Sequence, residues 1–221
     1  TELKEFENIR TNGKIAITLR EDDQLISVKK TTGDKEILMA SSDGRMIRFD
    51  EKELRVLGRT ASGVRGIDVG NSICVGMEIA EKGQHILAVT EKGYGKQTNV
   101  SEYRETKRGS KGVKALSITD KNGDIASFKV ARPDADVVII TDSGMVMRMP
   151  LEQISVLSRV TQGVRLINLK NEQSVATISL VDKEKEEEII DETSGVVVDN
   201  NKLIETVDML KEEVVDNDVP R

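Results

Sequence analysis

A repeat of about 50 residues is the feature that most limits what this chain can fold into. Three segments read as a strand, a tight turn with glycine, and a second strand; they span residues 37–49, 86–98 and 137–149. Their turn glycines, Gly44, Gly93 and Gly144, lie 49 and 51 residues apart. Asp-Gly and similar pairs supply the positive φ that a tight turn requires, so each segment is predicted to form a β-hairpin.

A second motif follows each hairpin at a constant distance. Its clearest copies span residues 56–67 and 156–167, and a variant copy spans 107–116. A further copy at 9–17 has no hairpin of its own, and its Gly13 lies 50 residues before Gly63. Together with the start at Thr1 rather than Met, this orphan copy suggests a fragment that begins inside a repeat.

Short strands at this spacing favour a propeller-like array over helical repeats. Apolar and polar residues alternate as they do in half-buried strands, for example in residues 145–149, and short helical turns are expected at 50–54 and 150–154. We therefore predict an all-β body, residues 1–182, of about three blades and part of a fourth. The predicted blades lie near residues 1–35, 36–84, 85–135 and 136–182.

The charge is distributed unevenly along the chain. Of 33 basic and 39 acidic residues, 5 and 13 lie in residues 183–221, so this end carries a net charge of −8. The remaining residues, 1–182, are close to neutral. We interpret the C-terminal part as a disordered acidic tail that follows the body.

Few residues are suited to catalysis or metal binding. His85 and Cys74 are the only histidine and cysteine, which excludes an internal disulfide and a Cys/His zinc site. The run from Gly93 to Lys96 superficially suggests a phosphate loop, but it lacks the required spacing and is assigned to a hairpin turn. No apolar stretch is long enough for a membrane helix, and no secretory leader is visible, so a cytoplasmic protein is expected.

Basic side chains recur at matching positions of the repeats. In a radial array such positions would form a curved stripe that holds and bends duplex DNA without reading bases. With only 2% aromatic residues, the chain is poorly equipped to stack single-stranded bases. The alternative is that these are ordinary strand-face charges matched by Glu and Asp. The predicted DNA-binding residues are Arg45, Arg48, Arg59, Arg65, Lys92, Lys96, Lys107, Arg108, Lys111, Lys114, Arg148, Arg159 and Arg165.

The repeats resemble those of the C-terminal DNA-wrapping domain of the A chain of bacterial DNA gyrases. The matching motifs lie in order at residues 43–49, 58–67, 93–98, 141–144 and 161–164, and the resemblance covers about residues 6–178. It identifies the chain as the C-terminal half of such a domain. The family's Gln-Arg-Arg-Gly-Gly-Lys-Gly box is absent, and residues 106–112 are a degenerate version of it.

The resemblance implies a β-pinwheel, a relative of the propeller whose neighbouring blades exchange strands. It also implies a non-catalytic module that wraps duplex DNA for ATP-dependent negative supercoiling by a type II topoisomerase, an isomerase. The parent protein, a gyrase A protein, would assemble with a second copy of itself and with the gyrase B protein through an N-terminal part absent here. ATP and Mg would act elsewhere in that enzyme. No cofactor, metal or membrane is expected for this chain, and its location would be cytoplasmic and nucleoid-associated.

Two other functions remain open. The missing box leaves the comparable DNA-binding domain of topoisomerase IV, at the C-terminus of its A protein, as an alternative. A propeller-like scaffold that binds other proteins through its blade loops is an alternative of a different class.

Overall fold

The computed structural model describes residues 1–80, 83–170, 172–183, 189–190 and 197–198. The chain divides into two units, Thr1–Lys183 and Glu184–Arg221. The second unit contains a short pair of strands, β12 (Ile189–Ile190) and β13 (Val197–Val198). Most of the predicted acidic tail lies outside the described residues.

The three predicted hairpins are confirmed as antiparallel strand pairs. Their turn glycines have φ values of 86°, 78° and 80°, as the tight turns require. The pairs are β1 (Glu36–Ser41) with β2 (Arg45–Asp50), β4 (His85–Thr90) with β5 (Tyr94–Asn99), and β8 (Ala135–Thr141) with β9 (Val146–Pro150).

A third strand from the same repeat joins each hairpin beside its first strand. These strands are β3 (Cys74–Ala80), β7 (Ile125–Val130) and β11 (Val175–Asp182). Short 3-10 turns follow the hairpins, and those predicted at 50–54 and 150–154 are confirmed. They are η2 (Glu51–Glu53), η3 (Val100–Glu102) and η4 (Leu151–Gln153).

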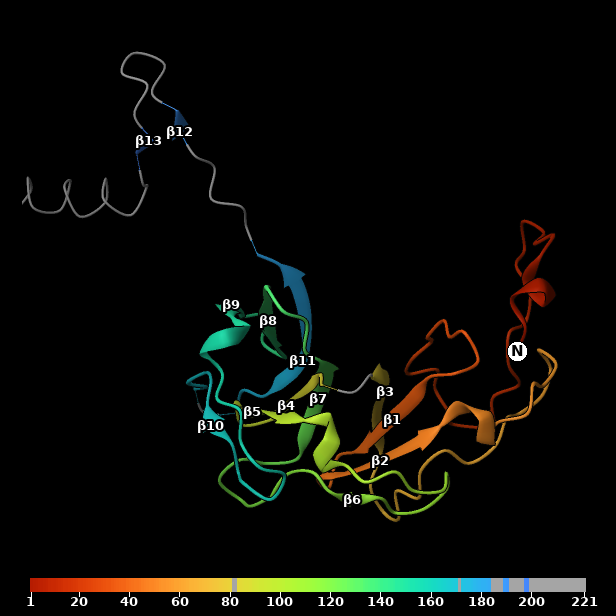
Figure 1. Cartoon of the computed structure of the whole chain (residues 1–221), viewed down its shortest axis with the longest axis horizontal. Helices are drawn as coiled ribbons and strands as arrows, with labels where there is room; N and C mark the ends of the chain where they lie inside the picture. Colours follow the sequence, from red (N-terminus) through yellow and green to blue (C-terminus); the bar gives the residue numbers. More distant parts are fainter. Residues whose placement is uncertain (81–82, 171, 184–188, 191–196, 199–221) are drawn as a thin grey trace, which may run out of the picture. The chain divides into compact units, whose positions relative to one another are not determined.

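Neighbouring repeats exchange strands, as the resemblance to a β-pinwheel implies. The first sheet has the order β3-β1-β2-β6, and its β6 (Val113–Lys114) comes from the following repeat. The second sheet, β10-β5-β4-β7, likewise receives β10 (Val164–Arg165) from the third repeat. Figure 1 shows β6 beside β2 and β10 beside β5. Each exchanged strand therefore ties one sheet to the next.

Hydrophobic cores lie between successive sheets. Leu38 of the first sheet belongs to one cluster with Ile86 and Phe128 of the second. Leu87, which follows Ile86 in β4, belongs to another cluster with Val137 of the third sheet. Successive side chains of a strand point to opposite faces, so the middle sheet is buried on both sides.

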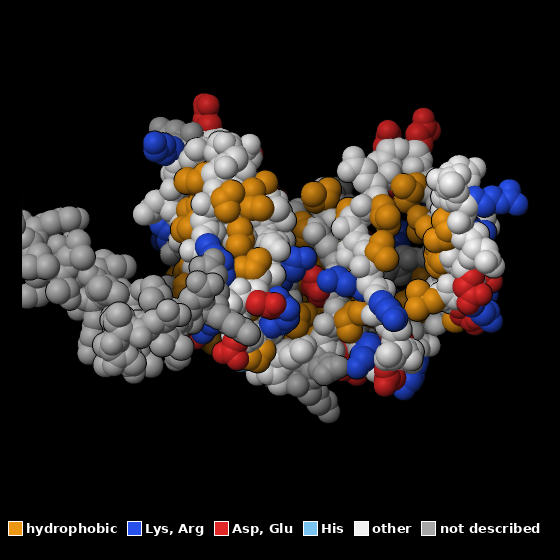
Figure 2. All heavy atoms as spheres, turned by 90° about the horizontal axis from the view of Figure 1, so that it is seen from above, with side chains coloured by type: hydrophobic (Ala, Val, Ile, Leu, Met, Phe, Trp, Pro, Cys, Tyr) orange, Lys and Arg blue, Asp and Glu red, His pale blue; other side chains and the backbone are white. Residues whose placement is uncertain are grey.

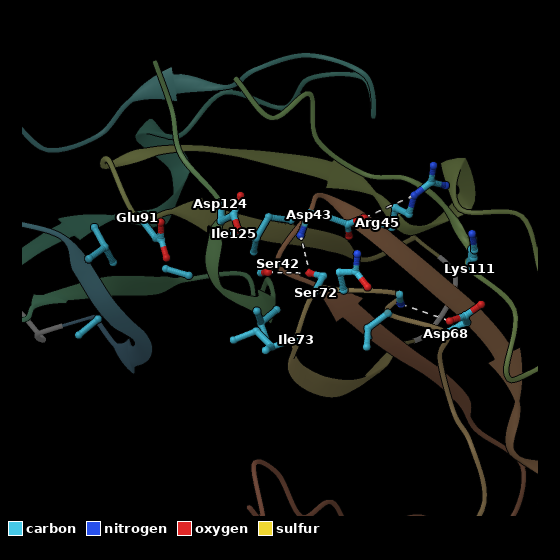
Figure 3. A pocket seen from close by; sticks show the side chains of 17 residues that line it. Ser42, Asp43, Arg45, Asp68, Ser72, Ile73, Glu91, Lys111, Asp124 and Ile125 are labelled. Atoms are coloured by element: carbon cyan, nitrogen blue, oxygen red, sulfur yellow. Dashed lines mark hydrogen bonds and ion pairs between the residues drawn. The ribbon is translucent and has the colours of Figure 1, made fainter. Parts of the chain in front are cut away.

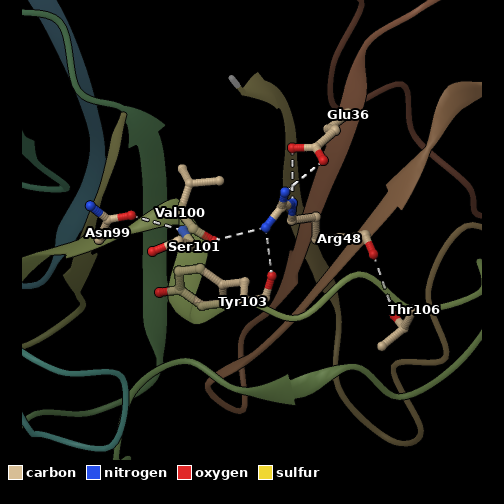
Figure 4. A network of polar contacts seen from close by, with 7 residues as sticks. All are labelled: Glu36, Arg48, Asn99, Val100, Ser101, Tyr103 and Thr106. Atoms are coloured by element: carbon tan, nitrogen blue, oxygen red, sulfur yellow. Dashed lines mark hydrogen bonds and ion pairs between the residues drawn. The ribbon is translucent and has the colours of Figure 1, made fainter. Parts of the chain in front are cut away.

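In the first two repeats, the second strand of the hairpin also fixes the following repeat through a polar side chain. Arg48 of β2 is held by Glu36 at 2.9 and 2.6 Å, and it donates to the carbonyl oxygens of Val100 (3.3 Å) and Tyr103 (3.0 Å) at η3 (Figure 4). Gln97 holds the equivalent position in β5, and its Nε2 donates to the carbonyls of Leu151 and Ile154 at η4. The two repeats use different side chains for the same contact.

The third sheet, β11-β8-β9, has three strands among the described residues. Val146 of β9 is 61% exposed, whereas the equivalent Met46 of β2 is fully buried. Met46 belongs to the hydrophobic cluster shared with the second sheet, whereas Val146 belongs to none of the clusters of the described residues. In addition, β6 pairs with the edge of β2, and no described strand pairs with the equivalent edge of β9. An unpaired edge of this kind is a surface at which another strand can pair.

Residues 1–35, predicted to form part of a fourth blade, contain the 3-10 turn η1 (Leu3–Phe6) and no strand. This part of the chain has no hairpin with which a strand of its repeat would pair. It contacts β3 through side chains, with Ser27 Oγ donating to the carbonyl of Met77 at 3.3 Å and Lys29 paired with Glu78 at 2.7 Å. Ile15 and Val28 are exposed, and Figure 2 shows hydrophobic side chains on both lobes of the face in view.

Candidate nucleic-acid interface

The segments that link hairpin to third strand run beside one another in neighbouring repeats. They comprise residues 9–18, 56–68, 107–117 and 156–168, which we call the linking belt. At equivalent positions, a backbone N–H of one segment donates to a carbonyl of the next. These bonds join Thr18 N to Ala61 O (3.4 Å), Asp68 N to Ser110 O (3.0 Å) and Ser117 N to Thr161 O (3.1 Å).

At each of these junctions, an arginine side chain makes a further hydrogen bond between the two neighbouring segments. Arg108 Nη1 donates to the carbonyl oxygen of Arg65 at 3.2 Å, and Arg159 Nη1 donates in the same way to that of Lys114. Arg59 makes the equivalent bond to Ile15. We call these three bonds the arginine staples.

Two of the three arginine staples place cations of successive repeats next to one another. Arg108 lies beside Arg65, and Arg159 lies beside Lys114, although each pair is separated by more than 40 residues of sequence. Lys107, Lys111, Lys114, Arg65 and Arg165 are exposed or half-buried in the same segments, and the stapling arginines are half-buried. Eight of the thirteen predicted DNA-binding residues thus lie on the linking belt.

Two carboxylates partly oppose this positive charge. Glu53 accepts a bond from the backbone N–H of Arg108 at 3.1 Å, and Glu102 accepts the equivalent bond from Arg159 at 3.0 Å. Both carboxylates lie in the 3-10 turns that precede the linking segments. They fix the backbone of the turns that carry the stapling arginines, a role that the sequence did not indicate.

Three predicted cations lie outside the linking belt, near or on the surface. Arg45 follows the first hairpin turn and lies 3.7 Å from Asp43. Lys92, in the second turn, donates to the carbonyl of Asp120. Arg148 of β9 donates to Asp136 at 2.7 Å and to the carbonyl of Asp182 at 2.9 Å.

The structure argues against direct DNA contact for Arg48 and Lys96, two of the predicted residues. Arg48 is 8% exposed and Lys96 is 1% exposed. Lys96 Nζ donates to the carbonyls of Ser158 (2.6 Å) and Arg159 (2.5 Å) and to Thr161 Oγ1 (3.2 Å). Both side chains point into the junction with the next repeat, where a phosphate has no access.

A signal for the burial of Lys96 was present in the sequence. Aligned on the turn glycines, Lys96 occupies the position of Ile47 and Met147, which are apolar. Burial lowers the pKa of Lys96 to about 8, an effect opposed by nearby Glu102 and reinforced by Arg159. Lys96 therefore has the surroundings of a core residue rather than of a surface cation.

Comparison with known families confirms the resemblance found in the sequence. The family model of the DNA gyrase C-terminal domain, a beta-propeller, matches residues 1–32, 35–80, 84–132 and 135–182. The chain belongs to this family. Each of the three matches after residue 34 contains one hairpin and its third strand, so the family repeat coincides with the sheets of the structure.

Curated relatives of this gyrase C-terminal domain are gyrase A proteins. The DNA gyrase A protein of Ureaplasma parvum serovar 3 is 46% identical over 179 residues, which cover 80% of this chain and 21% of the relative. That of Staphylococcus aureus strain MRSA252 is 41% identical over 222 residues, covering 99% and 24%. The chain thus spans about a quarter of the length of the relatives it matches.

Two solved structures share the fold. A DNA gyrase A C-terminal domain superposes with a TM-score of 0.71 at 23% identity, covering 76% of this chain and 58% of the other. The C-terminal domain of a DNA topoisomerase IV gives 0.77 at 24% identity, covering 82% and 57%. At this identity both support the fold alone, whereas the family model and the curated relatives identify the gyrase domain.

The remaining chemistry of the described residues is limited. They include no cluster of three or more His, Cys, Asp or Glu side chains arranged to hold a metal ion. No described helix is long and apolar enough to cross a membrane.

Proposed function

We propose that the unit Thr1–Lys183 binds duplex DNA along the linking belt and bends it, as the wrapping module of the A protein of a bacterial DNA gyrase. The observation that supports this proposal is the repetition of the arginine staples. Two of them fix cations of successive repeats side by side, and the third fixes Arg59 against Ile15, along segments that are hydrogen-bonded to one another. Duplex DNA carries about one negative charge per 1.7 Å of its axis, so a line of fixed cations suits its backbone.

Bending follows from the repeat. Both exchanged strands pair with the previous sheet in the same register, so cations at equivalent positions should recur at similar intervals along the array. A duplex that contacts all of them must bend, and contacts with phosphates offset the elastic cost. Binding of this type has little sequence preference because it uses no base edges.

Membership of this family supports a proposal for the role of the whole protein. In the parent enzyme, wrapping would present a second DNA segment for strand passage during ATP-dependent negative supercoiling. The gyrase B protein, like the second copy of the A protein, would be contacted by parts of the protein outside this chain, where ATP and Mg would also act. We place the protein in the cytoplasm, associated with the nucleoid.

The test is binding to a long duplex across a salt series. Lys107, Lys111 and Lys114 make none of the staples with their side chains, so replacing all three by Gln removes charge without breaking a staple. The slope of log affinity against log salt should become shallower by up to about one per lysine that contacts a phosphate. The affinity of this variant should fall by similar amounts for duplexes of unrelated DNA sequence.

The matched control replaces Lys4, Lys30 and Lys52 by Gln, which removes the same charge from exposed positions outside the linking belt. This variant should keep the wild-type slope. Equal loss in both variants would show a general charge effect, and an unchanged slope in the belt variant would remove the basis of the proposal.

A further inference from the structure

A cavity of about 330 Å³ between the second and third repeats, which we call the Tyr94 cavity, is lined by four cations. It lies where the β4–β5 turn, the turn before β7, strand β10 and the segment before β11 come together. Its charged residues are Lys92, Lys121, Arg165 and Lys170, with Glu172 as the single carboxylate. Lys121 and Lys170 were not among the residues predicted to bind DNA.

A buried tyrosine orients two of these cations. Tyr94 is 6% exposed, and its hydroxyl oxygen accepts from Arg165 Nη2 at 2.8 Å and from Nε at 3.2 Å. The Arg165 guanidinium and the Lys121 ammonium each lie 5.4 Å from the centre of the tyrosine ring. Such contacts attract cations to the ring and restrict their side chains.

The guanidinium retains capacity for a ligand. Arg165 Nη1 also donates to Asn168 Oδ1 at 3.2 Å, so the described residues accept bonds from Nε, Nη1 and Nη2, one each. A guanidinium has five N–H donors, and two are left. Its planar fork matches the oxygens of a phosphate, which lysine ammonium groups contact as point charges.

The equivalent positions of the first sheet do not carry this concentration of positive charge, because Asp43, Lys114 and Thr119 stand at the positions of Lys92, Arg165 and Lys170. A cavity of about 770 Å³ adjoins the hairpin turn of the first sheet, where Asp43 and Arg45 occupy the positions of Lys92 and Tyr94 (Figure 3). Its wall also contains Asp68, Glu91 and Asp124, with Lys111 as the second cation. Acidic residues thus outnumber basic ones there, which is the reverse of the Tyr94 cavity.

We propose that the Tyr94 cavity binds a phosphate group, with Arg165, Lys121 and Lys170 as its donors. Four cations around one small cavity repel one another, and an oxyanion relieves that repulsion while accepting their hydrogen bonds. The phosphate is supplied either by the backbone of duplex DNA, since Arg165 also belongs to the linking belt, or by a free phosphoanion. Phosphate binding in this cavity does not require DNA to be wrapped around the protein.

The first experiment titrates the full chain with inorganic pyrophosphate at constant ionic strength and follows the NMR signals of Tyr94 and the Arg165 side chain. We expect saturable shifts centred on these residues. Replacing Lys121 and Lys170 by Gln should weaken the affinity about tenfold, as expected for loss of two charged contacts. Replacing Lys30 and Lys52 by Gln, with the same change in net charge, should alter it less than about twofold.

The second experiment adds short duplex DNA to the pyrophosphate complex. Displacement of pyrophosphate identifies DNA phosphates as occupants of the cavity, and retention of pyrophosphate identifies a free phosphoanion. The proposal is overturned if pyrophosphate causes no saturable shift at Tyr94, or if the two variants lose affinity equally. DNA affinity with a normal salt slope in that case would leave the proposed DNA-binding function intact.

Discussion

The buried Lys96 provides a test of how neighbouring repeats are joined. Replacing it by Met introduces the residue found at the equivalent position in the third repeat, Met147, so the side chain should fit. The change removes the ammonium that binds Ser158, Arg159 and Thr161. At neutral pH the lost hydrogen bonds and the relieved burial of charge oppose each other, so the pH dependence is the informative quantity.

The sign follows from the lowered pKa. Below about pH 8 both the folded and the unfolded chain carry the Lys96 proton, and the folded state bears the full cost of burying the charge. Between about pH 8 and the ordinary value of 10.5, the unfolded chain keeps the proton that the folded chain has lost. Stability therefore rises with pH across this window, by at most about 3 kcal/mol for a shift of this size.

The three oxygen acceptors favour the ammonium, so the gain should lie below this limit. Urea unfolding at several pH values gives the unfolding free energies of wild type and Lys96→Met. Their difference at each pH isolates Lys96, because the contributions of the other titrating groups are common to both proteins and cancel. This difference should rise in favour of wild type above about pH 8. A difference that stays constant or falls would refute the reasoning, and exposed Lys52→Met serves as the control that shows no such rise.

Three further predictions concern stability, which urea unfolding measures, and the third also uses an absorbance titration. Arg48→Met leaves Glu36 without its bidentate partner and should lower the free energy of unfolding by about 3–5 kcal/mol. The double variant Arg48→Gln, Glu36→Gln should recover more than half of this loss. No recovery would contradict the proposed role of Arg48. Gly163→Ala places a Cβ 2.7 Å from the carbonyl oxygen of Gly95, whereas Gly63→Ala, at nearly the same φ, meets no atom within 4 Å. Gly163→Ala should therefore be more destabilising than Gly63→Ala by at least about 2 kcal/mol. Equal effects of the two substitutions would exclude a steric cause. Burial raises the pKa of Tyr103 to about 12, so in a Tyr94→Phe variant, where Tyr103 is the only tyrosine, the phenol should ionise near that pH in an absorbance titration. Stability should fall above about pH 10 because the unfolded chain loses the proton first. Ionisation of Tyr103 near pH 10 in this variant would contradict this.

Local sequence patterns were sufficient to predict the hairpins. Gly44, Gly93 and Gly144 mark the turns because positive φ is a property of the residue and its immediate neighbours. The 50-residue period then assigned the sheets to successive repeats, and the family motifs indicated that strands are exchanged. Residues 1–35 were the exception, because a strand needs a partner and this part of the chain contains no hairpin to supply one.

The tertiary structure decided the role of each cation, and only for Lys96 did the apolar residues at equivalent positions, Ile47 and Met147, indicate burial in the sequence. Arg45 and Arg48 lie three residues apart on one strand, yet Arg45 is exposed and Arg48 is buried against the next repeat. Lys96 was predicted to bind DNA, but packing of the third repeat encloses it. The arginine staples and the contact between Arg165 and Tyr94 bring together residues more than 40 positions apart in the sequence. These contacts form only because neighbouring repeats pack against one another. The sequence by itself determined the repeat and its turns, since these arise from local backbone preferences. Which charges face solvent was set by the packing of one repeat on another.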